Sequence, residues 1–576
     1  MKTFYSCLLL LFINVSLLSA QSVFILINND YTYMLDRYEI KSDNNVGNRI
    51  FSAMKPYLRK NVAQLADTLL SGDSIHYSKI DKANLKYLQD DNWEDSKNEN
   101  AGNGKKPFLK KLYEKKNDFY QFHNRDFEIQ VNPVLDFSAG REKGYGGLEY
   151  LNTRGVEIRG SIDQKIGFYT YFSDNQAVFP VYVRNEIKYF GGVVPGNGVF
   201  DDAFGKYGYD FFDANGYITF NFTKHINFQI GHDKNFIGNG YRSLFLSDFS
   251  GNYFFAKITT NVWKLQYTNI FAKLGAFTTA NTQTNTNYEG NKYMALNYLS
   301  VNITRKITIG FFESVTFGKT DSLQNRDFDP NYLDPVIFTK WAEDKTQYND
   351  KAHLGFDWKW NFLKHFSYYG QVFIDDILVH ALLDNTGSWV NTQAFQNGIK
   401  YIDVAGIKNL DMQLESNIVK PYTYTHTGFS QYANYSNYSN YTNDQMPLAD
   451  PYGANFYEWV GILRYQPHPK VSLTAKGIYT IIGLDSIGPN AKNYGSNIFL
   501  DYLTHVHDNG NTIAQGYKTH IEFVDFTVTW QVRHNLFIDF KSILRNESSE
   551  LAAYNSKTVY LGAALRWNIA QRLNEY

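Results

Sequence analysis

From about Phe127 onward, apolar and polar residues alternate with a period of two, and this pattern limits the fold more than any other feature of the chain. Successive side chains of a β-strand point to opposite faces, so the alternation predicts strands with one apolar face and one face that accepts charge. The clearest segments are 354–361, 471–481 and 559–568. A two-sheet sandwich could produce the same pattern, so the connections between strands must decide.

Short and long connections between the expected strands alternate along the chain. Tight turns are expected at 163–165, 223–225, 304–306, 363–365, 468–470 and 533–535, and long connections rich in Asn, Gly, Asp and Tyr at 174–215, 232–252, 275–292, 319–350, 420–455 and 485–515. Short turns at one end and long loops at the other are typical of outer-membrane barrels, and a sandwich has no reason to separate them. We therefore predict a transmembrane antiparallel β-barrel of about 18 strands, from near Phe127 to near Asn568.

The composition agrees with a barrel embedded in a membrane. The chain has 45 Tyr, 44 Phe and 9 Trp, yet its mean hydropathy is −0.41 and 20% of its residues are charged. An apolar band, aromatic girdles, a wet lumen and polar loops require this mixture, although a large secreted β-sandwich or propeller shares part of it. With 56 basic against 57 acidic residues, nothing suggests a nucleic-acid partner.

The first residues have the features of a secretory signal. Lys2 precedes an apolar run, Leu8 to Leu18, that is too short to span a bilayer, and Ala20 ends a possible cleavage site. We predict a signal peptide at 1–20; the alternative is an N-terminal membrane anchor. Cys7, the only cysteine, lies inside the apolar run, which disfavours a lipoprotein anchor and leaves the mature chain without thiols or disulfides.

Residues 21–124 differ from the rest of the chain and are expected to form a mostly helical periplasmic region, followed by the barrel at 125–576. Helical patterns are expected over Ile50–Leu70 and, with a basic face, over Pro107–Asp118. An even number of strands places both ends of the barrel on the periplasmic side. A lumen of this size is too wide for strand side chains to fill, so loops must plug it or it conducts.

A glycine-rich stretch, Gly231–Ser243, could bind a ligand. Lys234 and Arg242 could meet acidic sugars, and His232, Asp233 and Asn235 could hydrogen-bond to hydroxyl groups. The alternative is a loop folded into the lumen whose polar groups satisfy one another. The stretch does not match the G-x-G-x-x-G pattern of dinucleotide sites.

A tandem Asn-Tyr-Ser/Thr repeat lies in the long loop 420–455 and supplies Tyr435, Tyr438 and Tyr441. Aromatic rings stack on the apolar faces of sugars, so these three residues are candidate glycan-binding residues. The alternative is low-complexity loop sequence without a binding role. The H-E-x-x-H pattern is absent and the 13 His are scattered, so we expect no catalytic residues, no metal site and no cofactor.

Three groups of residues carry a resemblance to a known family. They are Asn28–Tyr31 with Leu35–Tyr38 and Lys55–Tyr57; Gly231–Asp248; and Pro447–Pro451 with Gly453–Phe456 and Glu458. With these the chain resembles the Wzi-like capsule-assembly family of outer-membrane barrels, and within it a Bacteroidetes branch that includes the gliding-motility protein RemB. The chain departs from the pattern at Asp450, where a His is expected, and in its last residues, 573–576, which follow the final strand.

The resemblance implies an 18-stranded barrel with a periplasmic helical bundle and a lectin-like role at the cell surface. We therefore expect a non-enzymatic outer-membrane protein that binds or organises cell-surface polysaccharide and supports capsule assembly or gliding motility. Its expected partners are outer-membrane lipid, extracellular polysaccharide and the gliding or surface-adhesin machinery. The alternatives are a porin-like channel or transporter and, with the least support, an enzyme embedded in the barrel.

Overall fold

The structure is a computed structural model of the whole chain. It describes residues 22–42, 50–72, 77–104, 111–277, 289–318, 328–343, 350–426, 439–488 and 491–576. The predicted signal peptide, with its cleavage site, lies outside the described residues. Within them, no helix is long and apolar enough to cross a membrane.

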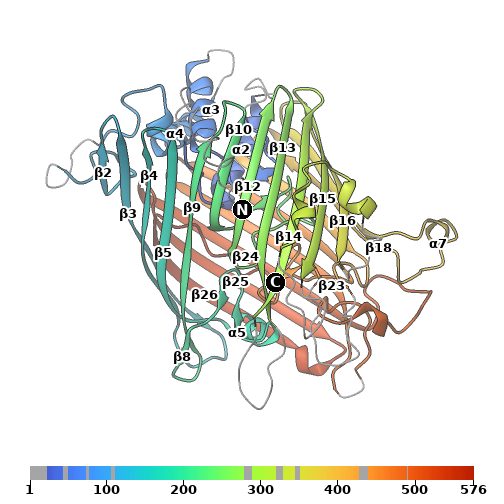
Figure 1. Cartoon of the computed structure of the whole chain (residues 1–576). Helices are drawn as coiled ribbons and strands as arrows, with labels where there is room; N and C mark the ends of the chain where they lie inside the picture. The colour runs from blue at the N-terminus through green and yellow to red at the C-terminus, as the bar shows by residue number, and fades with distance from the viewer. Residues whose placement is uncertain are drawn as a thin grey trace.

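Eighteen antiparallel strands close into a barrel, which confirms the predicted fold class (Figure 1). The barrel closes where the last strand pairs with the first, from Tyr560 opposite Glu142 to Trp567 opposite Leu135. Two short strands, β2 (Tyr120–His123) and β8 (Asp202–Phe204), extend the edges of β3 and β9. The eighteen strands are β3 (Phe127–Glu142), β4 (Glu149–Ile162), β5 (Ile166–Val178), β9 (Gly208–Asn221), β10 (Ile226–Asp233), β12 (Tyr253–Val262), β13 (Leu265–Phe277), β14 (Glu289–Asn302), β15 (Ile307–Gly318), β16 (Lys351–Phe362), β17 (Phe366–Asp376), β18 (Thr392–Tyr401), β19 (Leu410–Val419), β22 (Phe456–His468), β23 (Val471–Leu484), β24 (Tyr517–Arg533), β25 (Leu536–Ser549) and β26 (Ser556–Trp567).

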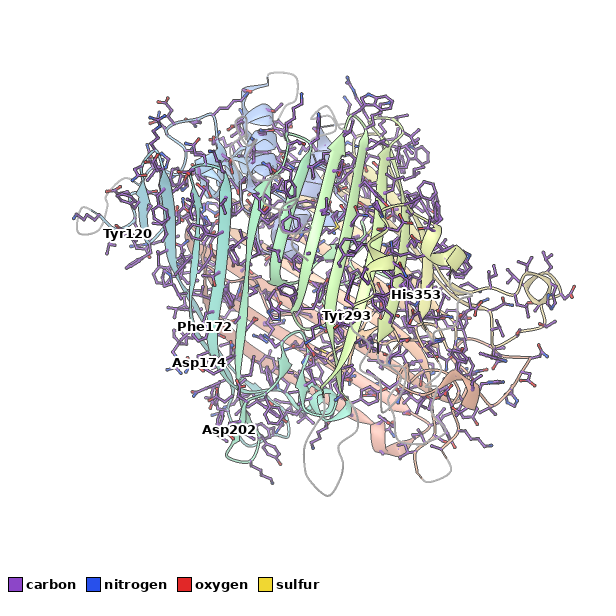
Figure 2. All side chains as sticks on the ribbon, in the orientation of Figure 1. Tyr120, Phe172, Asp174, Asp202, Tyr293 and His353 are labelled. Carbon is purple, nitrogen blue, oxygen red and sulfur yellow. The ribbon has the colours of Figure 1, made fainter. Side chains whose placement is uncertain are left out.

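The period-two alternation separates the two faces of the wall. In β16, Phe356 and Trp360 are exposed on the outside, whereas Asp357 and Lys359 between them are buried in the lumen. On the opposite side of the barrel, Phe172 of β5 is exposed, and its ring stacks on the ring of Phe212 in the neighbouring strand β9 (Figure 2). Exposed apolar rings outside and buried charge inside are the arrangement that a lipid-facing wall needs.

Connections of different length gather at opposite ends of the barrel, which we call the short-turn end and the long-loop end. All six predicted tight turns join consecutive strands at the short-turn end. Two of them place consecutive non-glycine residues at positive φ, Asp163 (52°) with Gln164 (54°) and Leu363 (52°) with Lys364 (58°). Paired positive φ angles are typical of type I′ turns, whose twist matches that of the flanking strands. At the long-loop end, the connection 377–391, which contains α7 (Val379–Leu383), was not predicted.

Among its described residues, the N-terminal region contains three α-helices, α2 (Asn29–Lys41), α3 (Arg59–Ser71) and α4 (Lys79–Asp91), at the short-turn end (Figure 1, blue). Asn28 caps α2, and Ser78 forms a capping box with Asp81 at the start of α4. Their apolar faces pack on one another around a common core, which contains Tyr38, Val62, Leu65, Leu85 and Leu88.

Two details of the helical prediction are wrong. The first helix of the 50–70 stretch begins at Arg59, because residues 54–55 form a short strand, β1 (Met54–Lys55), that pairs with β11 (Phe236–Ile237) inside the barrel. The basic stretch is not helical over its described part, 111–118. There Tyr113 adopts a φ of 57°, and Lys115 donates to the main chain at Ala101 and lies over the Trp93 ring, so the lysines hold an irregular loop.

Candidate functional site

The lumen of the barrel is filled by segments from both termini and from the long loops. At the N-terminal side, the amide of Phe24 donates to the Tyr217 hydroxyl at 2.8 Å, and the ammonium of Lys257 lies over the Phe24 ring. Both partners belong to strands of the wall. The first described residues therefore lie within the barrel.

The glycine-rich stretch crosses the lumen and is fastened to the opposite wall. The Glu415 carboxylate of β19 accepts hydrogen bonds from the amides of Tyr241 (2.7 Å) and Arg242 (3.0 Å). The Arg242 guanidinium donates to Glu458 of β22 at 3.0 and 3.2 Å. A side chain at Gly240 would approach the Glu415 carboxylate to 2.6 Å, so only glycine lets the loop lie this close to the wall.

The chain after β26 turns back into the barrel, and residues 568–576, which we call the tail, run through the lumen (Figure 1, C mark). The Tyr576 ring packs against Tyr182 of α5 (Val181–Tyr189) and against Phe249, with ring centroids 6.1 and 5.8 Å apart. The Glu575 carboxylate receives the Lys476 ammonium and the Tyr241 hydroxyl. The tail is thus bound by charge and by aromatic packing to β23, to α5 and to the connection between β10 and β12.

Three cavities bounded by described residues lie along the tail. The largest, about 260 Å³, is bounded by the glycine-rich stretch and by tail residues 569–573 and 575–576. A second, about 180 Å³, lies toward the N-terminal helices and shares Ile569 and Ala570 with the first. A third, about 100 Å³, shares Gln571 and Arg572 with the 260 Å³ cavity. The tail therefore divides the space that the other segments leave in the lumen.

The 260 Å³ cavity has a polar wall. Asp233 accepts from the Asn215 amide (3.1 Å), and Asn252 donates to Asp213 (3.1 Å). Lys234 donates from its ammonium to the main-chain oxygens of Gly196 (2.6 Å) and Asp248 (3.0 Å). The side-chain oxygen of Asn215 is buried and accepts no hydrogen bond from the residues that the structure describes. A ligand with hydroxyl groups could supply the missing donor.

Of the predicted binding residues, Asp233, Lys234 and Arg242 lie together around this cavity. Asn235 is buried behind it, where it accepts from Lys257 (3.0 Å). His232 is on the other face of β10 and points out of the barrel, because the strand continues to Asp233 instead of ending near Ile230. The geometry therefore separates His232 from the other charged residues.

Tyr441 is buried completely, contrary to the expectation of a ring free to stack on sugar. Its ring packs among His353, Phe373 and Tyr424, with centroids 4.9 to 5.8 Å apart. Tyr435 and Tyr438 lie outside the described residues. Within the described part of the loop, the repeat contributes to the packing of the lumen.

Sequence reasoning missed several residues of the cavity region. Asn215 and Glu415 lie on the polar, lumen-facing sides of their strands. Many polar residues share these sides, and the sequence does not show which of them a loop or a cavity will face. The sequence singles out Glu458 only as part of the motif shared with the resembling family. The tail carries no periodic pattern that would predict its return into the barrel. Among the described residues, no group of three or more His, Cys, Asp or Glu side chains could hold a metal ion.

Comparisons with known proteins support the fold. No protein-family model and no curated protein sequence matches the chain. Among solved structures, it is similar to Wzi of Escherichia coli, described as an outer membrane protein involved in group 1 capsule assembly and as a carbohydrate-binding β-barrel. The match has 12% identity and a TM-score of 0.53, and covers 95% of this chain and 100% of Wzi. Pseudomonas aeruginosa OprD also matches, with 8% identity and a TM-score of 0.41, over 76% of this chain and 94% of OprD. The chain therefore has the fold of an outer-membrane barrel and is similar to Wzi over nearly its whole length.

Proposed function

We propose that the protein is a non-enzymatic outer-membrane barrel that binds or organises cell-surface polysaccharide and so supports capsule assembly or gliding motility. The observation that carries the proposal is the filled lumen. The N-terminal residues, the glycine-rich stretch and the tail all lie inside the barrel and are held by buried hydrogen bonds and ion pairs. An open pore would leave this space to water.

The polar cavity supplies a place for a sugar. Asn215, Asp233 and Lys234 line it with both donors and acceptors, which is the mixture that sugar hydroxyls require. The carbohydrate binding of Wzi, which has the same fold, makes this ligand class the first to test. The N-terminal helices would face the periplasm, because short turns form the periplasmic end of such barrels. The resemblance to the family branch that includes a gliding-motility protein adds surface adhesins to the proposed partners.

Polysaccharide binding by the purified full chain tests the proposal. Extracellular polysaccharide from the producing cells, separated into neutral and acidic fractions, is titrated against immobilised protein. We expect Asn215→Ala to weaken binding, because it removes a side chain from the cavity wall. Asn227→Ala is the matched control, since Asn227 is a buried lumenal asparagine of β10 that bonds to Thr219 and Asn221 away from the cavity.

The alternative is a porin-like channel, and the same purified protein distinguishes it. If neither fraction binds and solutes pass through the reconstituted barrel, the channel replaces the polysaccharide proposal. If binding occurs but Asn215→Ala behaves like Asn227→Ala, the proposed cavity is not the binding site.

A further inference from the structure

The outer wall of the barrel carries a line of polar residues where lipid is expected. Asn269 of β13, Asn297 of β14 and Glu313 of β15 are register partners, and all three point outward. Asn269 donates to Asn297 (2.7 Å), and Asn297 donates to Glu313 (3.2 Å). Glu313 lies in the middle of its strand. A carboxylate at this depth is costly in contact with acyl chains.

Part of the long connection between β15 and β16 covers this line from outside. We call residues 328–343 the strap; it contains η2 (Pro330–Leu333) and α6 (Thr339–Glu343). The amide of Trp341 donates to the Glu313 carboxylate at 3.0 Å. As a result Glu313 is completely buried although it points away from the lumen.

Aromatic contacts hold the strap against the wall. Phe328 packs edge-on against Tyr293 of β14, with ring centroids 5.7 Å apart, and Figure 2 labels Tyr293 on this side of the barrel. Phe338 packs edge-on against Phe311 at 6.1 Å. Toward the short-turn end, the Tyr267 hydroxyl donates to the main chain of Pro335. The strap thus lies on the outer faces of β13, β14 and β15.

The strap buries the side chain of its Lys340 and leaves several of its apolar side chains exposed. Lys340 is 2% exposed and donates to the Asp334 main chain at 2.9 Å. Leu333, Val336 and Phe338 face outward and are 49%, 57% and 44% exposed. A loop in water normally has the reverse arrangement.

The strap's contacts extend along the part of the wall that faces lipid. Phe311 and Phe317, which contact Phe338 and Phe328, are six residues apart on β15, or about 20 Å at the rise of a strand. The apolar band of such barrels is about 25 Å tall. Phe311 is the register partner of Phe356, an exposed ring of the lipid-facing wall. The strap's apolar face is therefore continuous with that wall.

We propose that the strap lies within the bilayer, where Leu333, Val336 and Phe338 contact lipid acyl chains and the strap shields the polar line from them. Two carboxylates of the strap, Asp329 and Asp334, are partly exposed, and both fit this placement. Asp334 precedes Pro335, whose partner Tyr267 is only the third residue of β13, so it lies toward one membrane boundary. Asp329 follows Phe328, whose partner Phe317 is the last residue but one of β15, so it lies toward the opposite membrane boundary. At either boundary a charge costs much less than at the bilayer centre.

Single cysteines can place the strap, because residues 22–576 contain none. Val336→Cys is labelled with bimane, and the full chain is reconstituted into phosphatidylcholine vesicles with or without bromine on the acyl chains. Leu561→Cys on β26, which is 63% exposed on the outer wall, is the lipid reference. Asp202→Cys, exposed at the long-loop end, is the water reference (Figure 2). Leu333→Cys repeats the test if Val336→Cys assembles poorly.

We expect brominated lipid to cause the same loss of bimane emission at Val336 as at Leu561, and none at Asp202. In vesicles that contain the cysteine variants without bimane, a charged maleimide should react with Asp202→Cys but not with Val336→Cys. Reaction at Val336 as fast as at Asp202 would place the strap in water and overturn the proposal. If brominated lipid does not quench the label at Val336 and the maleimide does not react there, the proposal is also overturned. A protein surface, such as a second copy of this chain, would then cover the strap.

Discussion

Arg37 of α2 joins the N-terminal helices to the barrel, and we expect its replacement to release them. Its guanidinium bonds to Asp81 of α4 (3.2 Å), to Asp403 in the turn between β18 and β19 (2.7 Å), and to Asp411 of β19. The side chain is 2% exposed. Lys41 adds ion pairs to Asp81 and Asp403. One cation thus satisfies carboxylates from both parts of the protein.

Arg37→Met keeps most of the side-chain volume and removes the charge. Asp81 and Asp403 would then share Lys41, and Asp411 would lose its ion pair with Arg37. Removing one partner of a buried ion pair costs about 3–5 kcal/mol. At about 1.4 kcal/mol for each factor of ten, the ratio of docked to undocked helices should fall by about two to three and a half orders of magnitude. Hydrogen exchange of the amides in α2 and α4, measured on the full chain in membranes, should accelerate accordingly.

Lys86→Met is the control in the same region. Lys86 pairs with Asp90 on the surface of α4, where half of its side chain is exposed, and such pairs contribute about 0–1 kcal/mol. We expect nearly unchanged exchange in this variant. If Arg37→Met exchanged no faster than Lys86→Met, the Arg37 cluster would not hold the helices to the barrel.

Three further predictions concern the same architecture. Burial raises the pKa of Asp403, but Arg37 and Lys41 outweigh it and lower this pKa from 3.8 to about 2. Docking of the helices, measured by hydrogen exchange, should therefore be stable above about pH 4 and weaken as the pH falls toward 2. Weakening that starts near neutral pH would contradict this prediction. Leu473→Arg, on the outer face of β23, changes the third residue of that strand, which lies toward the membrane boundary; it should cost less than the roughly 2–4 kcal/mol of an Arg at the bilayer midplane but more than Thr474→Arg beside the 180 Å³ cavity, and equal loss of heat-modifiable gel mobility would refute the assignment of faces. Tyr441→Ala should destabilise the lumenal packing by about 3–5 kcal/mol and lower the temperature at which gel mobility shifts; an unchanged temperature would show that the buried ring contributes little.

Regular elements of the fold could be predicted because their signals are local. The strand ends near Phe127 and Asn568 follow from alternation, and the tight turns follow from short polar breaks between alternating segments. The strap could not be predicted in this way. Asn297 and Glu313 look like lumenal positions in sequence, and only the covering segment explains why they point outward.

The candidate site depended on contacts between distant segments. Arg242 was expected to be available for an acidic ligand, but it pairs with Glu458, which lies 216 residues away in sequence. Likewise Lys476 meets Glu575 only because the tail re-enters the barrel. The position of His232 depended on where β10 ends, and an extension of three residues turned this side chain out of the barrel. Strand ends are where sequence patterns are least precise.

Ion conductance of the full chain in a planar bilayer tests the filled lumen most directly. We predict that the intact protein is almost silent, because the N-terminal residues, the glycine-rich stretch and the tail occupy the barrel. A chain truncated after Asn568 serves as the comparison, since it removes the tail that separates the three cavities and should conduct more. Steady open-channel conductance by the intact protein, equal to that of the truncated chain, would contradict a closed barrel and support the porin-like alternative.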